Sequence, residues 1–424
     1  MQKFFIQNFG CRATQADGAA LEGLLGRQGM DSASDASSAD LVILNTCTVT
    51  ATADEDVRKS IHRVHRENPA ARILVTGCYA QRAPEELSRI PGVTWVVGNS
   101  HKTQIAGIVD PSTPYHSQIH VGDIFSTTDF LSSPVEAAAS DRTRPNLKIQ
   151  DGCNNICSFC IIPSVRGRSR SMSPEQVIEQ VNALAASYKE IVLTGVNLGR
   201  WGRERREKRL VDLLRRILAE TQTERLRLSS IEPMDLSDEL LELMAAEPRI
   251  AKHVHAPLQS GSDTVLKRMK RRYRVRHYEA RIEKAFSLMP WAGYGADVMT
   301  GFPGETDAEF NETVHFIERM PFTYLHVFTY SERPGTPAAA LPQVPHPVRR
   351  ERTRFLRALG ERNNQEFRRK LAGRRVSAVT LSDGTALTEN YLRIPLTHSR
   401  PANQIIDLDL DLGTGHLFPI FPAS

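Results

Sequence analysis

The sequence predicts an α/β protein in three parts: an N-terminal doubly wound parallel sheet, a central (β/α)6 partial barrel and a small C-terminal β-barrel module. Short apolar runs alternate with helical patterns over residues 1–108 and again over residues 143–345, which is typical of parallel sheets. Only short strand-like runs remain after residue 373. The length of 424 residues also exceeds what one ordinary hydrophobic core requires.

The first part contains four apolar runs and three helical patterns. The predicted strands are Lys3–Gln7, Leu41–Asn45, Arg72–Thr76 and Thr94–Val97, and the predicted helices are Ala19–Arg27, Ala53–Glu67 and Pro84–Arg89. Ligands of such sheets gather beyond the carboxyl ends of the strands. Cys11, Cys47 and Cys78 each follow one of these runs within a few residues. We therefore expect three strand ends to present one thiol each to a shared point.

Residues 109–142 lose this periodicity and collect Pro, Ser and small side chains, which predicts a linker. The middle part then resumes the alternation, and six repeats favour a partial barrel, with an open doubly wound sheet as the competing topology. Its predicted strands are Leu147–Gln150, Glu190–Thr194, Arg225–Ser229, His253–Ala256, Ala296–Met299 and Tyr324–Phe328, and its helices include Pro174–Ser187 and Leu210–Glu220.

The last part begins with a connecting helix over residues 346–372, whose charged body is Glu351–Leu371. Residues 373–424 predict a small β-barrel module with a turn at Asp383–Gly384. Its strand-like runs are Val376–Leu381, Leu387–Ile394 and Gln404–Leu410.

Lys and Arg residues are clustered along the chain, although the formal net charge is only +5. The clusters are Arg203–Arg209, Lys267–Arg276, Arg349–Arg357 and Arg368–Arg375. Clustered cations suit a polyanion, whereas solvated helix faces are the ordinary alternative for any single cluster. No apolar run approaches the ~18 residues that span a bilayer, and no signal peptide is evident. We expect a cytoplasmic protein without a membrane partner.

The six cysteines favour metal chemistry, because a protein without a secretory signal rarely forms disulfides. Cys153, Cys157 and Cys160 form a C-x3-C-x2-C loop directly after the first strand of the middle part. Three thiolates leave one iron of a cubane iron–sulfur cluster open. Zinc is the alternative, but it needs a fourth ligand and usually paired C-x2-C spacing, neither of which this loop contains.

This loop, its position after the first strand of a six-fold βα unit, and Phe159 before the last cysteine resemble the radical S-adenosylmethionine (SAM) superfamily. The resemblance implies that the open iron binds the amino and carboxylate groups of SAM. It also implies that an electron from the cluster cleaves SAM to a 5′-deoxyadenosyl radical, with the protein positioning the reactants. Phe159 is accordingly a candidate for the cofactor site.

Cys11, Cys47 and Cys78 are spaced by 36 and 31 residues. Alone they would be interpreted as buried small residues. Ahead of a radical SAM loop they resemble the methylthiotransferases, in which a second three-cysteine cluster delivers sulfur. The resemblance thus implies two [4Fe-4S] clusters and SAM as cofactors. The family usually has Asn and Glu where this chain has Thr14 and Asp17, which affects the surroundings of the cluster and not its ligands.

Within that family the chain is most similar to the group that places a methylthio group on C2 of N6-threonylcarbamoyladenosine at position 37 of tRNA. The resemblance implies tRNA and a reducing, flavodoxin-like electron donor as partners, and a TRAM-like RNA-binding module at residues 373–424. The matching stretches are Gln150–Ser171, Leu193–Gly199, Arg227–Pro233, Pro257–Tyr273, Asp297–Thr306 and His326–Ala338.

Polar residues that follow the middle strands are the candidates for binding SAM. They are Asn197, Ser229, Ser230, Glu232, Gln259 and Asp297. Ordinary helix caps and turns are the alternative role for each. Arg166, with Arg168 and Arg170, suits a SAM carboxylate or a tRNA phosphate. Gly301–Thr306 lacks the lysine of a phosphate-binding loop and is interpreted as a turn.

Lys270, Arg271 and Arg272 are candidates for the tRNA site, and we hypothesise that one of them binds the threonine carboxylate of the substrate. Plain phosphate contact is the alternative. Three other functions remain open: the same chemistry on isopentenyladenosine in tRNA, the same chemistry on a ribosomal-protein aspartate, and a non-catalytic iron–sulfur RNA-binding sensor. The basic clusters argue against the aspartate, and the polar series at six strand ends argues against the sensor.

Overall fold

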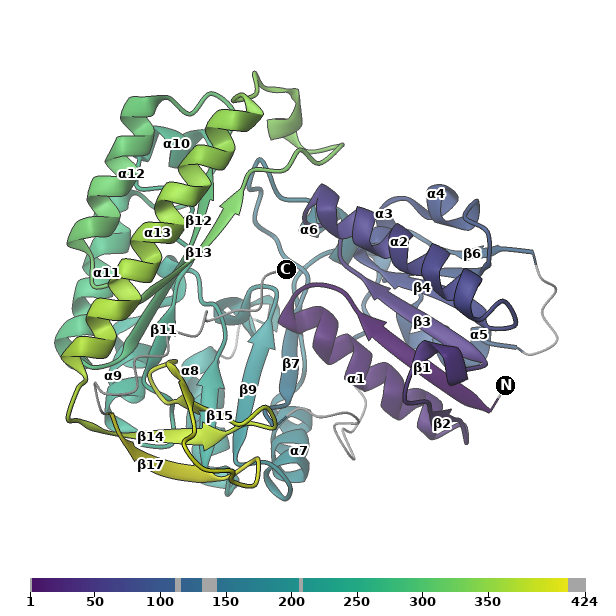
Figure 1. Ribbon diagram of the computed structural model, residues 1–424, viewed down its shortest axis with the longest axis horizontal. Coiled ribbons are helices and arrows are strands. Elements are labelled where there is room, and N and C mark those ends of the chain that lie inside the picture. The colour runs from purple at the N-terminus through teal and green to yellow at the C-terminus, as the bar shows by residue number, and fades with distance from the viewer. Residues whose placement is uncertain (1, 111–115, 132–142, 206–208, 411–424) are drawn as a thin grey trace.

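The computed structural model describes residues 2–110, 116–131, 143–205 and 209–410. Its N-terminal part is a parallel sheet in the order β2-β1-β3-β4-β5-β6 (Figure 1). The predicted strands are confirmed, and β2 and β6 were missed because they have only two and three residues. β6 lies within the predicted linker and extends the sheet. The strands are β1 (Lys3–Asn8), β2 (Asp31–Ser32), β3 (Leu41–Thr46), β4 (Arg72–Gly77), β5 (Val93–Gly98) and β6 (Gln118–His120).

Helices cover both faces of this sheet, as in a doubly wound fold. Leu41 and Ile43 of β3 pack with α1, whereas Val42 and Leu44 pack with α2 on the other face. This alternation follows from the period of two along a strand. The α1 helix begins seven residues earlier than expected. The helices are α1 (Arg12–Gly26), α2 (Ala51–Glu67), α3 (Cys78–Arg82), α4 (Pro84–Ser88) and α5 (Ile105–Ile108).

The middle part is a partial barrel made of two parallel sheets. One has the order β10-β9-β7, with the short antiparallel β8 (Arg170–Ser171) at its edge, and the other has the order β11-β12-β13. Leu226 bridges to Ile250 between them. The strands are β7 (Asn146–Asp151), β9 (Glu190–Gly195), β10 (Arg225–Leu228), β11 (His253–His255), β12 (Gly293–Thr300) and β13 (Tyr324–Thr329).

Amphipathic helices surround this barrel and bury its largest hydrophobic core, which includes Val177, Leu214 and Ile317. Several begin with side-chain caps that the sequence provides, such as Ser173 before α7 and Thr306 before α12. The helices are α6 (Ile162–Arg166), α7 (Pro174–Ala185), α8 (Leu210–Glu220), α9 (Asp238–Ala246), α10 (Asp263–Arg268), α11 (Val275–Leu288) and α12 (Asp307–Arg319).

The predicted connecting helix is α13 (His346–Lys370), which runs along the barrel to a C-terminal antiparallel sheet (Figure 1). The sheet order is β16-β15-β14-β17. The run Leu387–Ile394 is two strands, because Tyr391 has φ 71° and a turn closes from Thr388 to Leu392. The predicted closure into a barrel involves residues 411–424, outside the described ones. The strands are β14 (Arg375–Thr380), β15 (Thr385–Thr388), β16 (Arg393–Pro395) and β17 (Ile405–Asp409).

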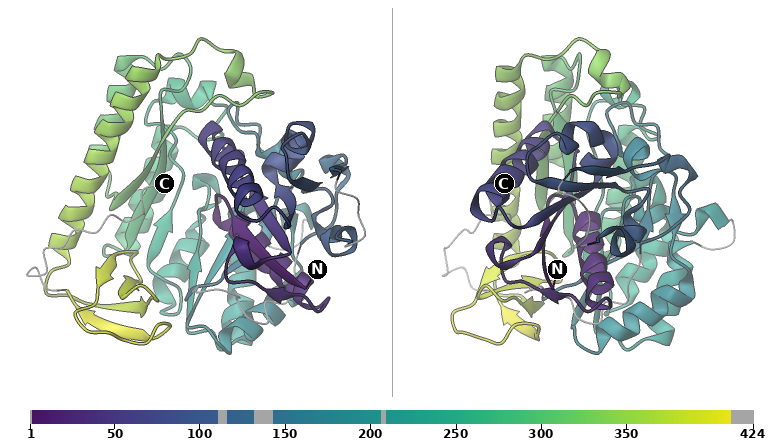
Figure 2. Two further views of the ribbon diagram at one scale, coloured as in Figure 1. Left: turned by 45° about the vertical axis from the view of Figure 1, so that its right-hand side comes forward. Right: turned by 90° about the vertical axis from the view of Figure 1, so that its right-hand side faces the viewer.

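The three parts contact one another closely. The N-terminal part lies beside the barrel, and the C-terminal sheet lies at its lower end (Figures 1 and 2). Arg12 of α1 donates to the Tyr391 hydroxyl at 2.8 Å, and Tyr391 stacks on His253 of β11 with ring centroids 4.3 Å apart. Within the described ranges, every helix is too short or too polar to cross a membrane.

Candidate active site

The C-x3-C-x2-C loop follows β7 and is held by backbone contacts. Gly152 has φ 69°, and a Cβ there would clash with the Arg168 carbonyl oxygen. The Cys153 amide donates to Gly167 O at 3.0 Å, and the Ser158 amide donates to Met269 O at 3.1 Å. The loop is therefore fixed at both ends at the carboxyl ends of the barrel strands, where the ligands of such a barrel bind.

The thiols of this loop are partly or wholly surrounded by protein. Burial raises the pKa of Cys160 to about 12 and raises the pKa of Cys153. The Asn155 amide donates to Cys153 Sγ at 3.4 Å, and the Asn197 side-chain amide approaches the same sulfur at 3.8 Å. Three half-buried thiols with donors aimed at sulfur fit a metal cluster, which supplies the positive charge that a buried thiolate needs.

Cys11, Cys47 and Cys78 lie together at the carboxyl ends of β1, β3 and β4. Cys11 is the N-cap of α1, and Cys78 is the first residue of α3. Burial, together with the neighbouring Cys11 and Cys78 thiols, raises the pKa of Cys47 to about 12. Gly10 makes this approach possible, because a Cβ there would lie 2.5 Å from Cys47 Cβ. The predicted meeting of three thiols at one sheet edge is thus present.

The two cysteine groups approach each other where α3 meets α6. Cys78 packs against Ile161, which follows Cys160, and against Val165 of α6. The Asn99 amide donates to Val165 O at 2.7 Å and lies 3.6 Å from Cys78 Sγ. The first cysteine group therefore lies against the segment that follows the second group in the chain.

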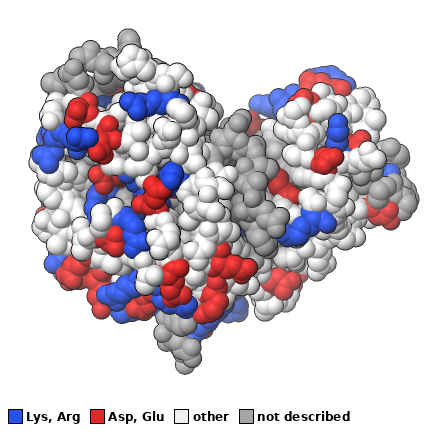
Figure 3. Space-filling view, turned by 90° about the horizontal axis from the view of Figure 1, so that it is seen from below, with Lys and Arg blue, Asp and Glu red and all other residues white. Residues whose placement is uncertain are grey.

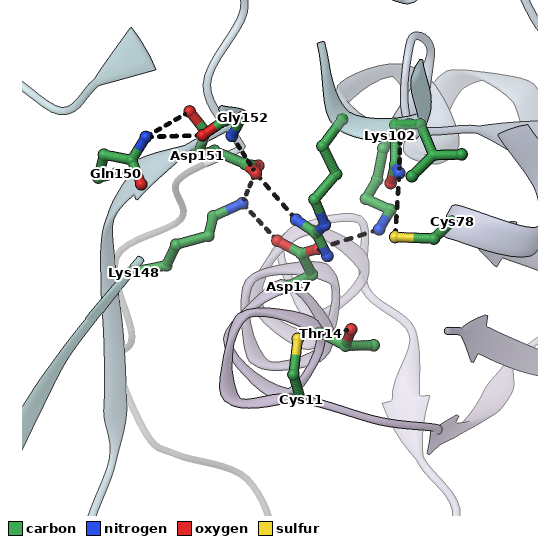
Figure 4. A network of polar contacts seen from close by, with 12 residues as sticks. Cys11, Thr14, Asp17, Cys78, Lys102, Lys148, Gln150, Asp151 and Gly152 are labelled. Carbon is green, nitrogen blue, oxygen red and sulfur yellow. Dashed lines mark hydrogen bonds and ion pairs between the residues drawn. The ribbon is translucent and has the colours of Figure 1, made fainter. Parts of the chain in front are cut away.

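A buried ionic network joins the parts beside this interface, as Figure 4 shows. Asp17 of α1 accepts from Lys102 at 3.1 Å, from Arg166 at 3.0 Å and from Lys148. Asp151 accepts from Lys148 at 2.8 Å and from Arg166 at 3.0 Å. Burial alone raises the pKa of Asp17, but the three cations lower it well below its usual range. Asp17 is therefore held by cations from both sides of the interface, whereas the cations of Asp151 all come from the barrel part.

This network changes the interpretation of Arg166. Its side chain is 2% exposed and occupied by Asp17 and Asp151, so it is not placed to bind SAM or a tRNA phosphate. Burial opposes its charge, yet the pKa of Arg166 is raised by Cys78 and by both carboxylates. Arg166 is a cation of the interface next to the first cysteine group. Lys102, Lys148 and Asp151 belong to the same network, which sequence patterns did not indicate.

A row of polar side chains at the ends of β9 and β10 faces the second cysteine group. Asn197 Oδ1, Ser229 Oγ and Ser230 Oγ are buried, and the described residues offer them no hydrogen-bond partner. Buried polar atoms are nearly always hydrogen-bonded in folded proteins. The Asn197 backbone amide donates a hydrogen bond to Gln150 Oε1 at 2.6 Å, which fixes the position of this residue. Asn197 lies beside Cys153, and unpaired polar atoms of this kind fit a polar cofactor such as SAM.

Glu232 and Arg271 form a buried pair on the other side of the loop. Burial raises the pKa of Glu232, and Arg271 opposes that rise. The Arg271 guanidinium also donates to Cys157 Sγ at 3.2 Å. Glu232 therefore matches the charge of Arg271. The hypothesis that one of Lys270, Arg271 and Arg272 binds the threonine carboxylate stays a prediction. Lys270 and Arg272 line the small cavity beside this pair.

Two further candidates for the cofactor site, Phe159 and Gln259, lie at different places around the cysteine loop and the barrel. Phe159 packs with Met269 and Phe302 and so holds the loop to the barrel. Gln259 adopts φ 64° at the end of β11, where its backbone pairs with Asp297 and Met299. Such left-handed backbone in a residue other than glycine is often a functional feature.

Asp297 lies deeper, within a histidine network that sequence reasoning missed. His255 Nε2 lies 3.1 Å and His326 Nδ1 lies 3.2 Å from Asp297 Oδ1. His253 and His255 both contact the Tyr324 hydroxyl, at 2.6 and 2.8 Å. This network could have been predicted from polar residues at alternate positions of buried strands, such as His253 and His255, because such residues point into a barrel.

The basic clusters of the sequence are partly neutralised by folding. Arg349 and Arg352 are buried, and Arg352 pairs with Glu305 at 2.7 Å and with Asp307 at 2.6 Å. On the face seen from below, Lys and Arg lie interspersed with Asp and Glu (Figure 3). Clusters of Lys and Arg along the sequence therefore overestimated how many of these side chains form a basic surface.

Comparisons with known proteins agree with this site. Residues 147–317 match the radical SAM superfamily, and residues 3–98 match a family described as uncharacterized protein family UPF0004. The chain is 37% identical to the threonylcarbamoyladenosine tRNA methylthiotransferase MtaB of Aquifex aeolicus, over 92% of this chain and 96% of the relative. It is 41% identical to the Bacillus subtilis protein of the same name, over 85% and 81%.

A tRNA-2-methylthio-N(6)-dimethylallyladenosine synthase of Dictyoglomus thermophilum is 34% identical over 80% of this chain and 78% of the relative. Among solved structures, the radical SAM methyltransferase TsrM of Kitasatospora setae superposes with a TM-score of 0.58 at 17% identity, covering 80% of this chain and 75% of that one. This last likeness concerns the fold alone. By its relatives and its domains, the chain belongs to the radical SAM tRNA methylthiotransferases, a family of SAM-dependent transferases.

Proposed function

We propose that this protein inserts a methylthio group at C2 of N6-threonylcarbamoyladenosine at position 37 of tRNA. The observation that carries the proposal is the packing of Cys78, from the first cysteine group, against Ile161 and Val165, which closely follow Cys160 of the second group. Relatives named for this substrate match most of the chain. Methylthiolation needs a sulfur donor and a radical source near one adenine, and two adjoining thiol groups suit that need.

Cys153, Cys157 and Cys160 would hold a [4Fe-4S] cluster, and Asn197, Ser229, Ser230 and Glu232 would contact SAM. Together these groups supply reductive cleavage of SAM to a 5′-deoxyadenosyl radical, with the electron coming from an external flavodoxin-like donor. The chain itself fixes the loop and offers unpaired hydroxyls to the cofactor.

Cys11, Cys47 and Cys78 would hold a second [4Fe-4S] cluster with one open iron for sulfur. Cys11 is exposed, whereas Cys47 and Cys78 are buried. An adenine entering the interface must leave its base stack, as in other enzymes that act on one base.

The proposal is tested by anaerobic reconstitution with iron and sulfide, followed by SAM, dithionite and tRNA that carries threonylcarbamoyladenosine. We expect ~8 irons per chain from two four-iron clusters, 5′-deoxyadenosine, and a methylthiolated nucleoside on mass spectrometry. The competing tRNA carries isopentenyladenosine. Modification of the competing tRNA alone would contradict the substrate, and loaded protein that forms no 5′-deoxyadenosine would contradict the chemistry.

Replacing one cysteine group at a time should separate the two halves of the reaction. The triple variant C11A/C47A/C78A is expected to bind ~4 irons and still form 5′-deoxyadenosine from SAM, because the barrel loop is intact. It should form no methylthiolated nucleoside. The variant C153A/C157A/C160A should retain ~4 irons and form neither product. Equal iron contents in the wild type and both triple variants would contradict the assignment of two separate cluster sites.

Gly10→Ala tests the geometry of the first group without removing a thiol. The added Cβ would lie 2.5 Å from Cys47 Cβ and 2.9 Å from its sulfur, at a residue with φ 103°. We therefore expect loss of about half the iron. Gly26→Ala in α1 is the control, because a Cβ there meets nothing within 4 Å, and it should keep the full iron content. Normal iron in both variants would contradict the predicted crowding.

A further inference from the structure

A cavity of about 480 Å³ opens where the three parts of the chain meet. Cys11, Arg12 and Gln15 of the N-terminal part line one side, Arg144 and Asn146 line the barrel side, and Asp383 lies on the C-terminal sheet. The cavity therefore reaches from a thiol of the first cysteine group towards the lower end of the barrel. None of the contacts described so far assigns it an occupant.

The cavity has cationic walls with unused donors. The Arg144 Nε donates to Glu190 at 2.6 Å, while its buried Nη2 has no partner among the described residues. Glu190 is also held by Arg227 at 2.8 Å and lies 3.7 Å from Arg225. One carboxylate thus faces three guanidinium groups. The cluster carries an excess of positive charge that a second anion would balance.

Arg12 adds a further cation on the opposite wall. Its guanidinium donates to the Tyr391 hydroxyl at 2.8 Å, and no acidic side chain of the described ranges lies within ion-pair distance of it. Asp383 contributes little negative charge, because it is paired with Arg393. Asn146 Nδ2 donates to Gln15 at 3.1 Å, and Asn146 Oδ1 is buried without a partner in the described chain. The walls thus offer guanidinium and amide groups, which suit a carboxylate next to an amide.

We propose that this cavity binds the threonylcarbamoyl group of the target adenosine, with its carboxylate on Arg144 and Arg12. The inference rests on the proposed function and identifies how its substrate is selected. The group joins N6 of the adenine through a carbamoyl amide and ends in a carboxylate. Its amide N–H can donate to Asn146 Oδ1, and its carboxylate can accept from the guanidinium groups. Its attachment beside Cys11 leaves the adenine at the first cysteine group, where C2 must react.

An apolar isopentenyl group would leave these donors unsatisfied. A site built to hydrogen-bond a substrate strongly disfavours an analogue that lacks the bonding group, because its own buried polar atoms stay unpaired. The positive charge of the cavity therefore selects the threonylcarbamoyl group over the isopentenyl group. A backbone phosphate of tRNA is the other source of an anion, and it would bind equally whatever base occupies position 37.

Binding of three anticodon stem-loops to the full, reconstituted chain distinguishes these sources. The stem-loops have identical phosphates and carry threonylcarbamoyladenosine, isopentenyladenosine or adenosine at position 37. Wild type should bind the first more tightly than the third by on the order of 10- to 100-fold, the range for a charged hydrogen bond. Arg144→Met and Arg12→Met should each reduce that ratio towards one, and Arg144→Lys should restore part of it. Arg215→Met, on an exposed arginine of α8, should change nothing.

Three outcomes would overturn the inference. Arg144→Met and Arg12→Met could retain the wild-type ratio of binding between the threonylcarbamoyladenosine and adenosine stem-loops. Alternatively, these variants could bind all three stem-loops more weakly by the same factor, as phosphate contact predicts. The ratio could instead vanish in Lys270→Met or Arg272→Met. Iron content and melting temperature show that each variant is folded, and Glu190 keeps Arg227 as a partner when Arg144 is replaced. Wild-type protein that methylthiolates only isopentenyladenosine contradicts the proposed function, whereas correct product with an unchanged ratio contradicts only this inference.

Discussion

Replacement of Asp17 by Asn is expected to lower the free energy of unfolding by about 3–5 kcal/mol, the usual cost of breaking a buried ion pair by removing one partner. Asp17 is 1% exposed and contacts Lys102, Lys148 and Arg166. The variant leaves Lys148 and Arg166 with Asp151 as their remaining carboxylate, and it leaves Lys102 buried without an ion-pair partner among the described residues. Thermal unfolding measures the loss, and hydrogen exchange in α1 and β7 locates it at the interface.

Asp56→Asn is the matched control, since Asp56 is exposed on α2, and its effect should stay within about 0.5 kcal/mol. The pH dependence gives a second check. The folded pKa of Asp17 lies below its unfolded value, so its stabilisation is present above about pH 4 and is lost as the pH falls through the folded pKa. The difference in melting temperature between wild type and Asp17→Asn should narrow below that pH. A constant difference would contradict the ionic origin.

Replacement of Arg271 by Met is expected to shift the reduction potential of the barrel cluster to more negative values. Arg271 donates to Cys157 Sγ at 3.2 Å, and its positive charge favours the reduced, more negative cluster. A charged hydrogen bond of ~1.5–3 kcal/mol corresponds to a shift on the order of 60–130 mV for one electron. A potentiometric titration followed by electron paramagnetic resonance measures it, without SAM or turnover.

Two controls separate charge at sulfur from disruption of the site. Arg272→Met changes an exposed neighbour and should leave the potential unchanged. The double variant Arg271→Met/Glu232→Gln removes the carboxylate that the single variant leaves buried and unpaired. It should retain most of the negative shift. Recovery of the wild-type potential in the double variant would attribute the shift to Glu232 alone.

Sequence patterns predicted most of the architecture, because each regular element repeats its own period. The six barrel strands and β1, β3, β4 and β5 are where the apolar runs placed them. The failures have local causes. β2 and β6 are too short to show a period, and the run Leu387–Ile394 is interrupted by a turn at Tyr391 that depends on one positive φ.

Site residues were predictable to different degrees. Cys153, Cys157 and Cys160 lie within one loop, so their spacing along the sequence was enough to predict a shared site. Ser229, Ser230 and Asn197 were found because the carboxyl ends of barrel strands face the site, and their unpaired oxygens are consistent with that role. The partners of Arg166 and Arg271 were not predictable, because an arginine in the sequence does not indicate which carboxylate will neutralise it.

The sequence by itself determined the fold class, the six thiols and the family, since all three depend on patterns within short stretches or on whole-chain similarity. The tertiary structure alone decided the partners of the charges. Asp17 meets Arg166 across 149 positions, and Arg12 meets Tyr391 across 379. The cavity likewise takes its walls from residues near 12, 144 and 383. The physical reason is that ion pairing and cavity shape depend on distances in space, which separation along the chain does not encode.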